Sequence, residues 1–133
     1  MKLVVDASVI AFFVMPDEGG DRAHPIYRHL VHDDLIAPDL YWYEVRNIAV
    51  KNVRRGRLPK SELDIVLAAI DAFPIELRAA GAGVDAMSLA NRHALSFYDA
   101  SYLALARTEN ALLATLDRSL SRAARAEGVL LEA

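Results

Sequence analysis

The chain has no cysteine among its 133 residues. That absence excludes disulfide bonds, zinc sites built from thiolates and a cysteine nucleophile, and it is typical of a protein from a reducing compartment. No apolar run approaches the ~20 residues that cross a bilayer. The apolar run after Lys2 ends at Asp6, well short of the roughly 7–15 residues of a signal peptide's apolar segment. We therefore expect a soluble cytoplasmic protein with no membrane partner.

Acidic residues are missing from the stretch between Val45 and Ser61, although the whole chain carries a net charge of −3. The overall charge disfavours a nucleic acid partner, whereas this local stretch would attract phosphates in a salt-dependent way. Cations near the end of a helix are also favourable for the helix itself, so both interpretations stay open. The basic residues of the stretch are Arg46, Lys51, Arg54, Arg55, Arg57 and Lys60.

What the chain does contain is enough apolar sequence for a packed core, since 54% of its residues are hydrophobic and 25% are charged. Its length fits a single domain over 1–133. Short apolar runs predict strands, and they alternate with segments of helical length, which indicates a three-layer α/β/α sandwich around a mostly parallel sheet. The expected strands are 2–5, 35–37, 75–77, 111–116 and 129–131, and the expected helices are 8–15, 21–32, 40–55, 61–73, 84–93, 97–109 and 119–127, with a loop over 16–20.

Three acids stand where helices are expected to begin. Asp6 and Asp117 directly follow predicted strands, and ligands of parallel sheets bind beyond the carboxyl ends of strands. Asp99 lies three residues after Ser96, the spacing of a capping box. Each of the three could therefore cap a helix or serve a functional site.

Glu44 has no capping role, because it falls inside a predicted helix. Its neighbours one turn away are Leu40 and Ile48, so the carboxylate lies at the border of the apolar face, where a lone charge is costly. It therefore needs a cation, either an arginine or a metal ion. Carboxylates gathered in one place repel one another unless a cation lies among them, and such hard oxygen ligands select Mg²⁺ or Mn²⁺.

Four segments resemble the motifs of PIN domains, and most closely those of the VapC-type toxins of toxin–antitoxin pairs. They follow the order and spacing of that family over essentially the whole chain, and the Tyr-Asp-Ala…Tyr-Leu-Ala segment is the most specific. The segments are Val4-Val5-Asp6-Ala7-Ser8, Tyr43-Glu44-Val45-Arg46-Asn47, Ser96–Ala106 and Thr115-Leu116-Asp117.

The resemblance implies a PIN-like sandwich with Mg²⁺ or Mn²⁺ held by Asp6, Glu44, Asp99 and Asp117. It implies hydrolysis of RNA by metal-activated water, a cognate antitoxin partner and a homodimer. Ser8 and Thr115 match positions where the family places a hydroxyl near the waters of the metal. The alternative function is a non-catalytic PIN-like module that binds RNA or protein. Phosphoryl-transfer domains are disfavoured, because Ser8 stands where a dehalogenase-like site needs a second Asp and receivers need a lysine later than Lys60.

Residues that would contact RNA are chosen by charge and by proximity to the acids. Arg118 and Arg122 share one helical face beginning beside Asp117 and could bind phosphates or pair with surface acids. Aromatic side chains could stack on bases or fill a core or dimer interface. His93 is interpreted as structural rather than as a general base. The candidates for RNA contact are Arg46, Lys51, Arg54, Arg55, Arg118 and Arg122, and those for stacking are Trp42, Tyr98 and Tyr102.

Overall fold

The computed structural model describes residues 1–16 and 20–132, so most of the loop expected over 16–20 lies outside the described residues. Its centre is a four-stranded sheet in the order β3-β2-β1-β4, with all three pairings parallel. The strands are β1 (Lys2–Val5), β2 (Asp34–Pro38), β3 (Glu76–Arg78) and β4 (Leu112–Ala114). The parallel sheet predicted from the alternation of apolar runs is confirmed.

Strand β1 occupies an interior position of the sheet, and its sequence explains why. Leu3, Val4 and Val5 are all 0% exposed, so both faces of the strand are covered. A strand buried on both faces is expected to be continuously apolar rather than alternating. Strand β3 lies at one edge, and its Glu76 and Leu77 are exposed.

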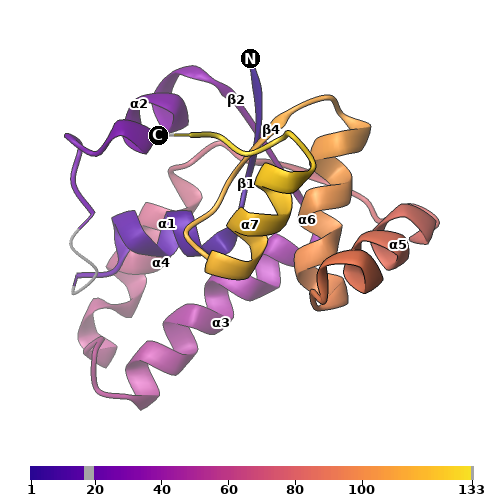
Figure 1. Cartoon of the computed structure of the whole chain (residues 1–133). Coiled ribbons are helices and arrows are strands. Elements are labelled where there is room, and N and C mark those ends of the chain that lie inside the picture. The colour runs from indigo at the N-terminus through magenta and orange to yellow at the C-terminus, as the bar shows by residue number, and fades with distance from the viewer. Residues whose placement is uncertain (17–19, 133) are drawn as a thin grey trace.

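Helices cover both faces of the sheet, which confirms the three-layer sandwich. Figure 1 shows α1, α3 and α4 to one side of the strands and α5 and α6 to the other. On the first side α1 packs against α3 and α4, and on the second α6 packs against β1, β2 and β4. The helices are α1 (Ala7–Val14), α2 (Pro25–His32), α3 (Leu40–Arg54), α4 (Leu63–Asp71), α5 (Val84–His93), α6 (Phe97–Thr108) and α7 (Arg118–Ala126), with a 3₁₀ turn η1 (Lys60–Glu62).

The chain order of the strands creates a switch point between β1 and β4. From β1 the chain moves outward through β2 to β3, and it then crosses back over the sheet through α5 and α6 to pair β4 with the other side of β1. Ligands of open parallel sheets bind at such a point, beyond the carboxyl ends of the strands. Asp6 follows β1 directly, and its backbone N–H donates to Ala114 O at 3.1 Å, so the two strand ends meet here.

Three sequence-based boundaries are wrong. Helix α2 begins at Pro25 rather than Asp21, because a residue before proline avoids the helical region, and His24 caps it by accepting the Ile26 N–H. The helix expected over 61–73 begins as α4 at Leu63, because Ser61 lies inside the 3₁₀ turn that starts after Pro59. The expected terminal strand over 129–131 is only an isolated bridge between Leu130 and Leu113.

Ser96 and Asp39 both directly precede helices, but only Ser96 caps its helix through the side chain. The Ser96 hydroxyl accepts the Asp99 N–H at 3.1 Å, as the spacing predicts. Asp39 precedes α3 without a side-chain cap bond, because its backbone is helical (φ −60°, ψ −25°) instead of extended. As for membrane spans, none of the helices in the described ranges combines the length and the apolar character that crossing a bilayer requires.

Candidate active site

Asp6 is the most buried of the four acids, with 7% of its surface exposed. It occupies the N-cap position of α1, yet its side chain makes no cap bond. Oδ2 instead accepts two hydroxyl hydrogen bonds, from Thr115 Oγ1 at 2.6 Å and from Ser8 Oγ at 2.9 Å. The capping interpretation of Asp6 is therefore wrong, and its carboxylate is held by two hydroxyls.

The same two hydroxyls fix the segment between β4 and α7. Thr115 Oγ1 accepts the backbone N–H of Asp117 at 3.1 Å, and Ser8 Oγ accepts that of Leu116 at 3.2 Å. Each hydroxyl thus donates to Asp6 and accepts from the backbone that leads to Asp117. Two acids 111 positions apart in the numbering (117 − 6) are joined through one hydrogen-bonded network.

Glu44 lies in the second turn of α3 and is half-buried, as its apolar neighbours predict. Its Oε1 accepts the hydroxyl proton of Tyr102 at 2.6 Å, a contact from α6 to α3. A phenol O–H therefore supplies a hydrogen bond to Glu44 and leaves its negative charge unneutralised. Tyr102 is 0% exposed, so of the two alternatives left open for it, the place in the core is confirmed and base stacking is excluded.

Asp99 and Asp117 differ in how well the capping alternative describes them. Asp117 caps α7, since its Oδ2 accepts the Leu120 N–H at 2.8 Å, and its side chain remains exposed. Asp99 lies in the first turn of α6, where its backbone N–H is capped by Ser96. Its carboxylate makes no side-chain hydrogen bond within the described part of the chain. Asp99 is therefore available for a ligand.

Burial and mutual repulsion raise the pKa of three of the four acids. Burial raises the pKa of Asp6, and the negative charge of Asp117 raises it further against the hydroxyl hydrogen bonds that lower it. Burial also raises the pKa of Glu44, with repulsion from Asp6 and Asp99 adding to it. For Asp99, burial and then repulsion from Asp6 and Asp117 raise the pKa to about 6. Asp6, Glu44 and Asp99 are thus each close enough to another of the four acids for its charge to raise their pKa.

A divalent metal fits the chemistry of this donor set. No ion pair with Lys, Arg or His involves any of the four acids in residues 1–16 and 20–132. The side chains as described include no group of three His, Cys, Asp or Glu placed to hold one ion. Mg²⁺ needs no such group, because it usually keeps several waters and binds proteins through one or two carboxylates. Clustered oxygen donors without a cation therefore suit a hydrated Mg²⁺ or Mn²⁺.

The basic candidates fall into three groups. Arg46 is already engaged, because its guanidinium lies 4.0 Å from the Trp42 ring and pairs with Asp71 at 2.7 Å. Lys51, Arg54 and Arg55 are exposed toward the far end of α3. Arg118 and Arg122 are exposed on the first turns of α7, next to Asp117.

Exposed aromatic side chains flank two of the acids in the sequence. Tyr98, beside Asp99, is 64% exposed, which leaves its expected stacking role open. Tyr43, beside Glu44, is 70% exposed, and sequence reasoning missed it. The signal was its place directly before Glu44 within the Tyr43–Asn47 segment. His93 donates or accepts a 2.7 Å bond with Glu127, consistent with its structural interpretation.

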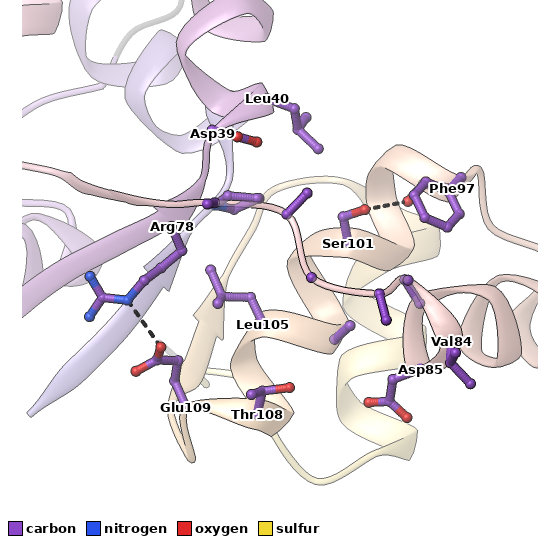
Figure 2. Close-up of a pocket in the computed structure, with 18 residues that line it drawn as sticks. Asp39, Leu40, Arg78, Val84, Asp85, Phe97, Ser101, Leu105, Thr108 and Glu109 are labelled. Atoms are coloured by element: carbon purple, nitrogen blue, oxygen red, sulfur yellow. Dashed lines mark hydrogen bonds and ion pairs between the residues drawn. The ribbon is translucent and has the colours of Figure 1, made fainter.

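A cavity of about 580 Å³ lies away from the acid cluster, and none of the four acids lines it. Figure 2 shows it between the start of α3, the 79–83 segment and α6, with the Arg78–Glu109 ion pair at one end. On α6 its lining includes Ser101, Leu105 and Thr108, whereas Asp99 and Tyr102 lie on the opposite helical face. This cavity and the acids therefore lie on different sides of α6.

A parallel sheet with carboxylates at its switch point defines an α/β domain with an acidic ligand site. The family model described as "PIN domain" matches residues 3–126, and the chain belongs to the PIN-domain family. It is similar to Ribonuclease VapC3 of Pyrobaculum aerophilum, at 39% identity over 124 residues covering 91% of this chain and 93% of the relative. It is also similar to the crystal structure of PAE2754 from Pyrobaculum aerophilum, with a TM-score of 0.68, 25% identity and coverage of 92% of this chain and 84% of the other.

Proposed function

We propose that the protein is a metal-dependent endoribonuclease of the VapC type. The observation that carries the proposal is the mutual repulsion of Asp6, Glu44, Asp99 and Asp117 at the sheet switch point, where no Lys, Arg or His of the described residues pairs with them. The similarity to Ribonuclease VapC3 supports RNA as the substrate. The alternative, a non-catalytic PIN-like binding module, has no use for four unneutralised carboxylates.

In this proposal the four acids hold Mg²⁺ or Mn²⁺ either directly or through its bound waters, and their environments divide their roles. When bound, the metal lowers the pKa of its water and neutralises charge on the phosphate. Asp6 and Glu44 are oriented by hydroxyls and provide fixed negative charge. Asp99 and Asp117 are more exposed to solvent than Asp6, and in this proposal they face the substrate. Hydrolysis adds water across one P–O bond of the RNA backbone.

The test is cleavage of total RNA by purified protein with Mg²⁺ or Mn²⁺, with EDTA, and with Asp6→Asn or Asp99→Asn. Loss of an outer partner of a metal typically costs 10–100-fold, so loss of a direct ligand is expected to lower activity by more than about 100-fold. Asp64→Asn, an exposed carboxylate on α4, is the matched control and should keep full activity. Cleavage that survives EDTA and both active-site substitutions would contradict the proposal.

In this proposal RNA lies along α7. Arg46 is not part of the RNA path, because it is already paired with Asp71. Arg118 occupies the first position of α7, where a cation opposes the positive end of the helix dipole. Its position there gains no stability from the helix, which favours a role in binding phosphate. Exposed Lys51, Arg54 and Arg55 extend the basic surface, and Arg54 lies ten residues, or roughly 15 Å, along α3 from Glu44. Tyr98 and Tyr43 are the proposed stacking side chains.

The toxin role adds two partners, an antitoxin and a second copy of the chain. The name of the similar VapC3 protein supports the first. Co-expression with the product of the adjacent small open reading frame should give a tight complex without nuclease activity. Sedimentation of the chain alone should give the mass of a homodimer. A nuclease that the product neither binds nor inhibits would contradict the toxin role and leave the nuclease intact.

A further inference from the structure

The phenol of Tyr102 ends on the carboxylate of Glu44, and we propose that Tyr102 is a positioning residue for the metal site. It holds Glu44 Oε1 and leaves Oε2, which has no side-chain hydrogen bond among the described residues, for the metal or its waters. The 2.6 Å contact joins residues 58 positions apart, one on α6 and one on α3. This inference rests on the proposed function and adds to it a residue outside the four acids.

Glu44 needs such an anchor because its side chain is long and its surroundings offer no other. Three rotatable bonds separate its carboxylate from the backbone, and none of the ion pairs among the described residues includes it. The Tyr102 hydroxyl is its only side-chain hydrogen-bond donor in residues 1–16 and 20–132. A hydrogen bond from a neutral hydroxyl to a carboxylate is short and strong, and it leaves the negative charge in place for a cation.

The anchor is itself rigid. Tyr102 is 0% exposed, so its ring is fixed by core packing rather than by solvent-facing contacts. It follows Asp99 by three residues, which puts both side chains on one face of α6. One helix therefore carries an acid of the cluster and also the hydroxyl that orients a second acid on α3. The α6 backbone fixes Asp99 relative to Tyr102, and the buried Tyr102 ring in turn fixes the carboxylate of Glu44.

Tyr41 provides a matched control within the same chain. It is also buried, at 4% exposed, and it lies on α3 one turn before Glu44. Its hydroxyl has no hydrogen-bond partner among the described residues. Tyr41→Phe and Tyr102→Phe thus remove the same atom from two buried rings, but only the second removes a contact with the acid cluster.

The experiment titrates Mn²⁺ alone into RNA-free protein by calorimetry, with thermal unfolding of each variant measured alongside. Tyr102→Phe keeps the ring that fills the core, and we expect it to bind Mn²⁺ about 10-fold more weakly, as for the loss of other groups that orient metal ligands. Tyr41→Phe should change the affinity by less than about 2-fold. The same comparison in a Glu44→Gln background should show no further effect of Tyr102→Phe, because the group through which it acts is gone.

Each outcome decides the inference. Equal Mn²⁺ affinity in Tyr102→Phe and wild type overturns it while leaving the nuclease proposal intact. A loss of equal size in the Glu44→Gln background also overturns it, because Tyr102 would then act by another route. Wild-type protein that binds no Mn²⁺ overturns both this inference and the metal-dependent function. Weaker binding that appears only when Glu44 is present supports the positioning role.

Discussion

Thr115 on the β4 side of the sheet donates its hydroxyl proton to Asp6 Oδ2 on the β1 side, at 2.6 Å. Thr115 Oγ1 in turn accepts the backbone N–H of Asp117, so Thr115 links two acids of the proposed metal site. Its exposed fraction is 7%, which leaves little water to replace these bonds. The Thr115 hydroxyl is therefore buried, and it helps to fix the positions of Asp6 and Asp117.

The first prediction concerns that hydroxyl. Thr115→Val keeps the shape of the side chain but leaves Asp6 without its shortest donor and the Asp117 N–H without its acceptor. We expect a loss of about 1–3 kcal/mol in the free energy of unfolding, measured by urea denaturation. Thr115→Ser retains the hydroxyl and should lose much less. Equal stability of the Val and Ser variants would show that the two hydrogen bonds contribute little.

The second prediction is that the metal-free protein becomes less stable as the pH rises from about 4 to about 6. The pKa of Asp99 is raised to about 6 by burial and by repulsion from Asp6 and Asp117, whereas an unperturbed aspartate has a pKa of 3.8. Between these values the folded state binds more protons than the unfolded state, so the free energy of unfolding falls with rising pH and levels off above the folded pKa. After allowance for solvent screening the decrease should be about 1 kcal/mol.

Thermal unfolding at several pH values, with and without Mn²⁺, measures this effect. Asp99→Asn removes the titrating group and should flatten the profile between pH 4 and 6. Mn²⁺ at neutral pH should stabilise the wild type, because it neutralises the repulsion that the ionised acids create. An Asp99→Asn profile that coincides with that of the wild type in the absence of metal would show that the pKa of Asp99 is not raised.

The third prediction concerns the Tyr41 hydroxyl, which is buried without a partner among the described residues. Burial raises the pKa of Tyr41, so the group stays protonated and its donor remains unsatisfied. Tyr41→Phe should leave the free energy of unfolding unchanged or raise it by about 1 kcal/mol, because an unpaired buried polar atom is removed. Guanidinium denaturation measures it. A loss of 2 kcal/mol or more would mean that the hydroxyl has a partner such as an internal water.

The fourth prediction tests the proposed RNA path on α7. Arg118→Gln combined with Arg122→Gln should raise KM for RNA while kcat changes little, because phosphate contacts position the substrate and the acids perform the reaction. If each arginine neutralises one phosphate of a single strand, the salt dependence of binding should lose about 1.4 from its slope. Fluorescence anisotropy with labelled RNA at several salt concentrations measures that slope.

Arg28→Gln is the control for this double variant. Arg28 is exposed on α2, which leads into the amino end of β2, away from the strand ends that carry the acids. Its removal should leave the slope unchanged. The α7 path would be refuted by a double variant whose slope matches that of Arg28→Gln.

The sequence alone was sufficient for the local features of this protein. The apolar run of β1 predicted a strand buried on both faces, and the Ser96–Asp99 spacing predicted a helix start that the structure confirms. The border position of Glu44 predicted a half-buried carboxylate, which the structure also shows. These features depend on neighbours within a few residues, so the adjacent sequence is enough to predict them.

Only the tertiary structure decided which side chains the acids contact. Asp6 could cap α1 or serve a site, and the Thr115 hydroxyl 109 positions away settles the direction of its carboxylate. Glu44 needed a partner, and a tyrosine 58 positions away donates a hydrogen bond to its carboxylate, a contact that the sequence did not predict. A sequence pattern reports the burial of a residue, because burial follows the period of a helix or strand. It does not report the long-range partner, because that depends on how whole elements pack against one another.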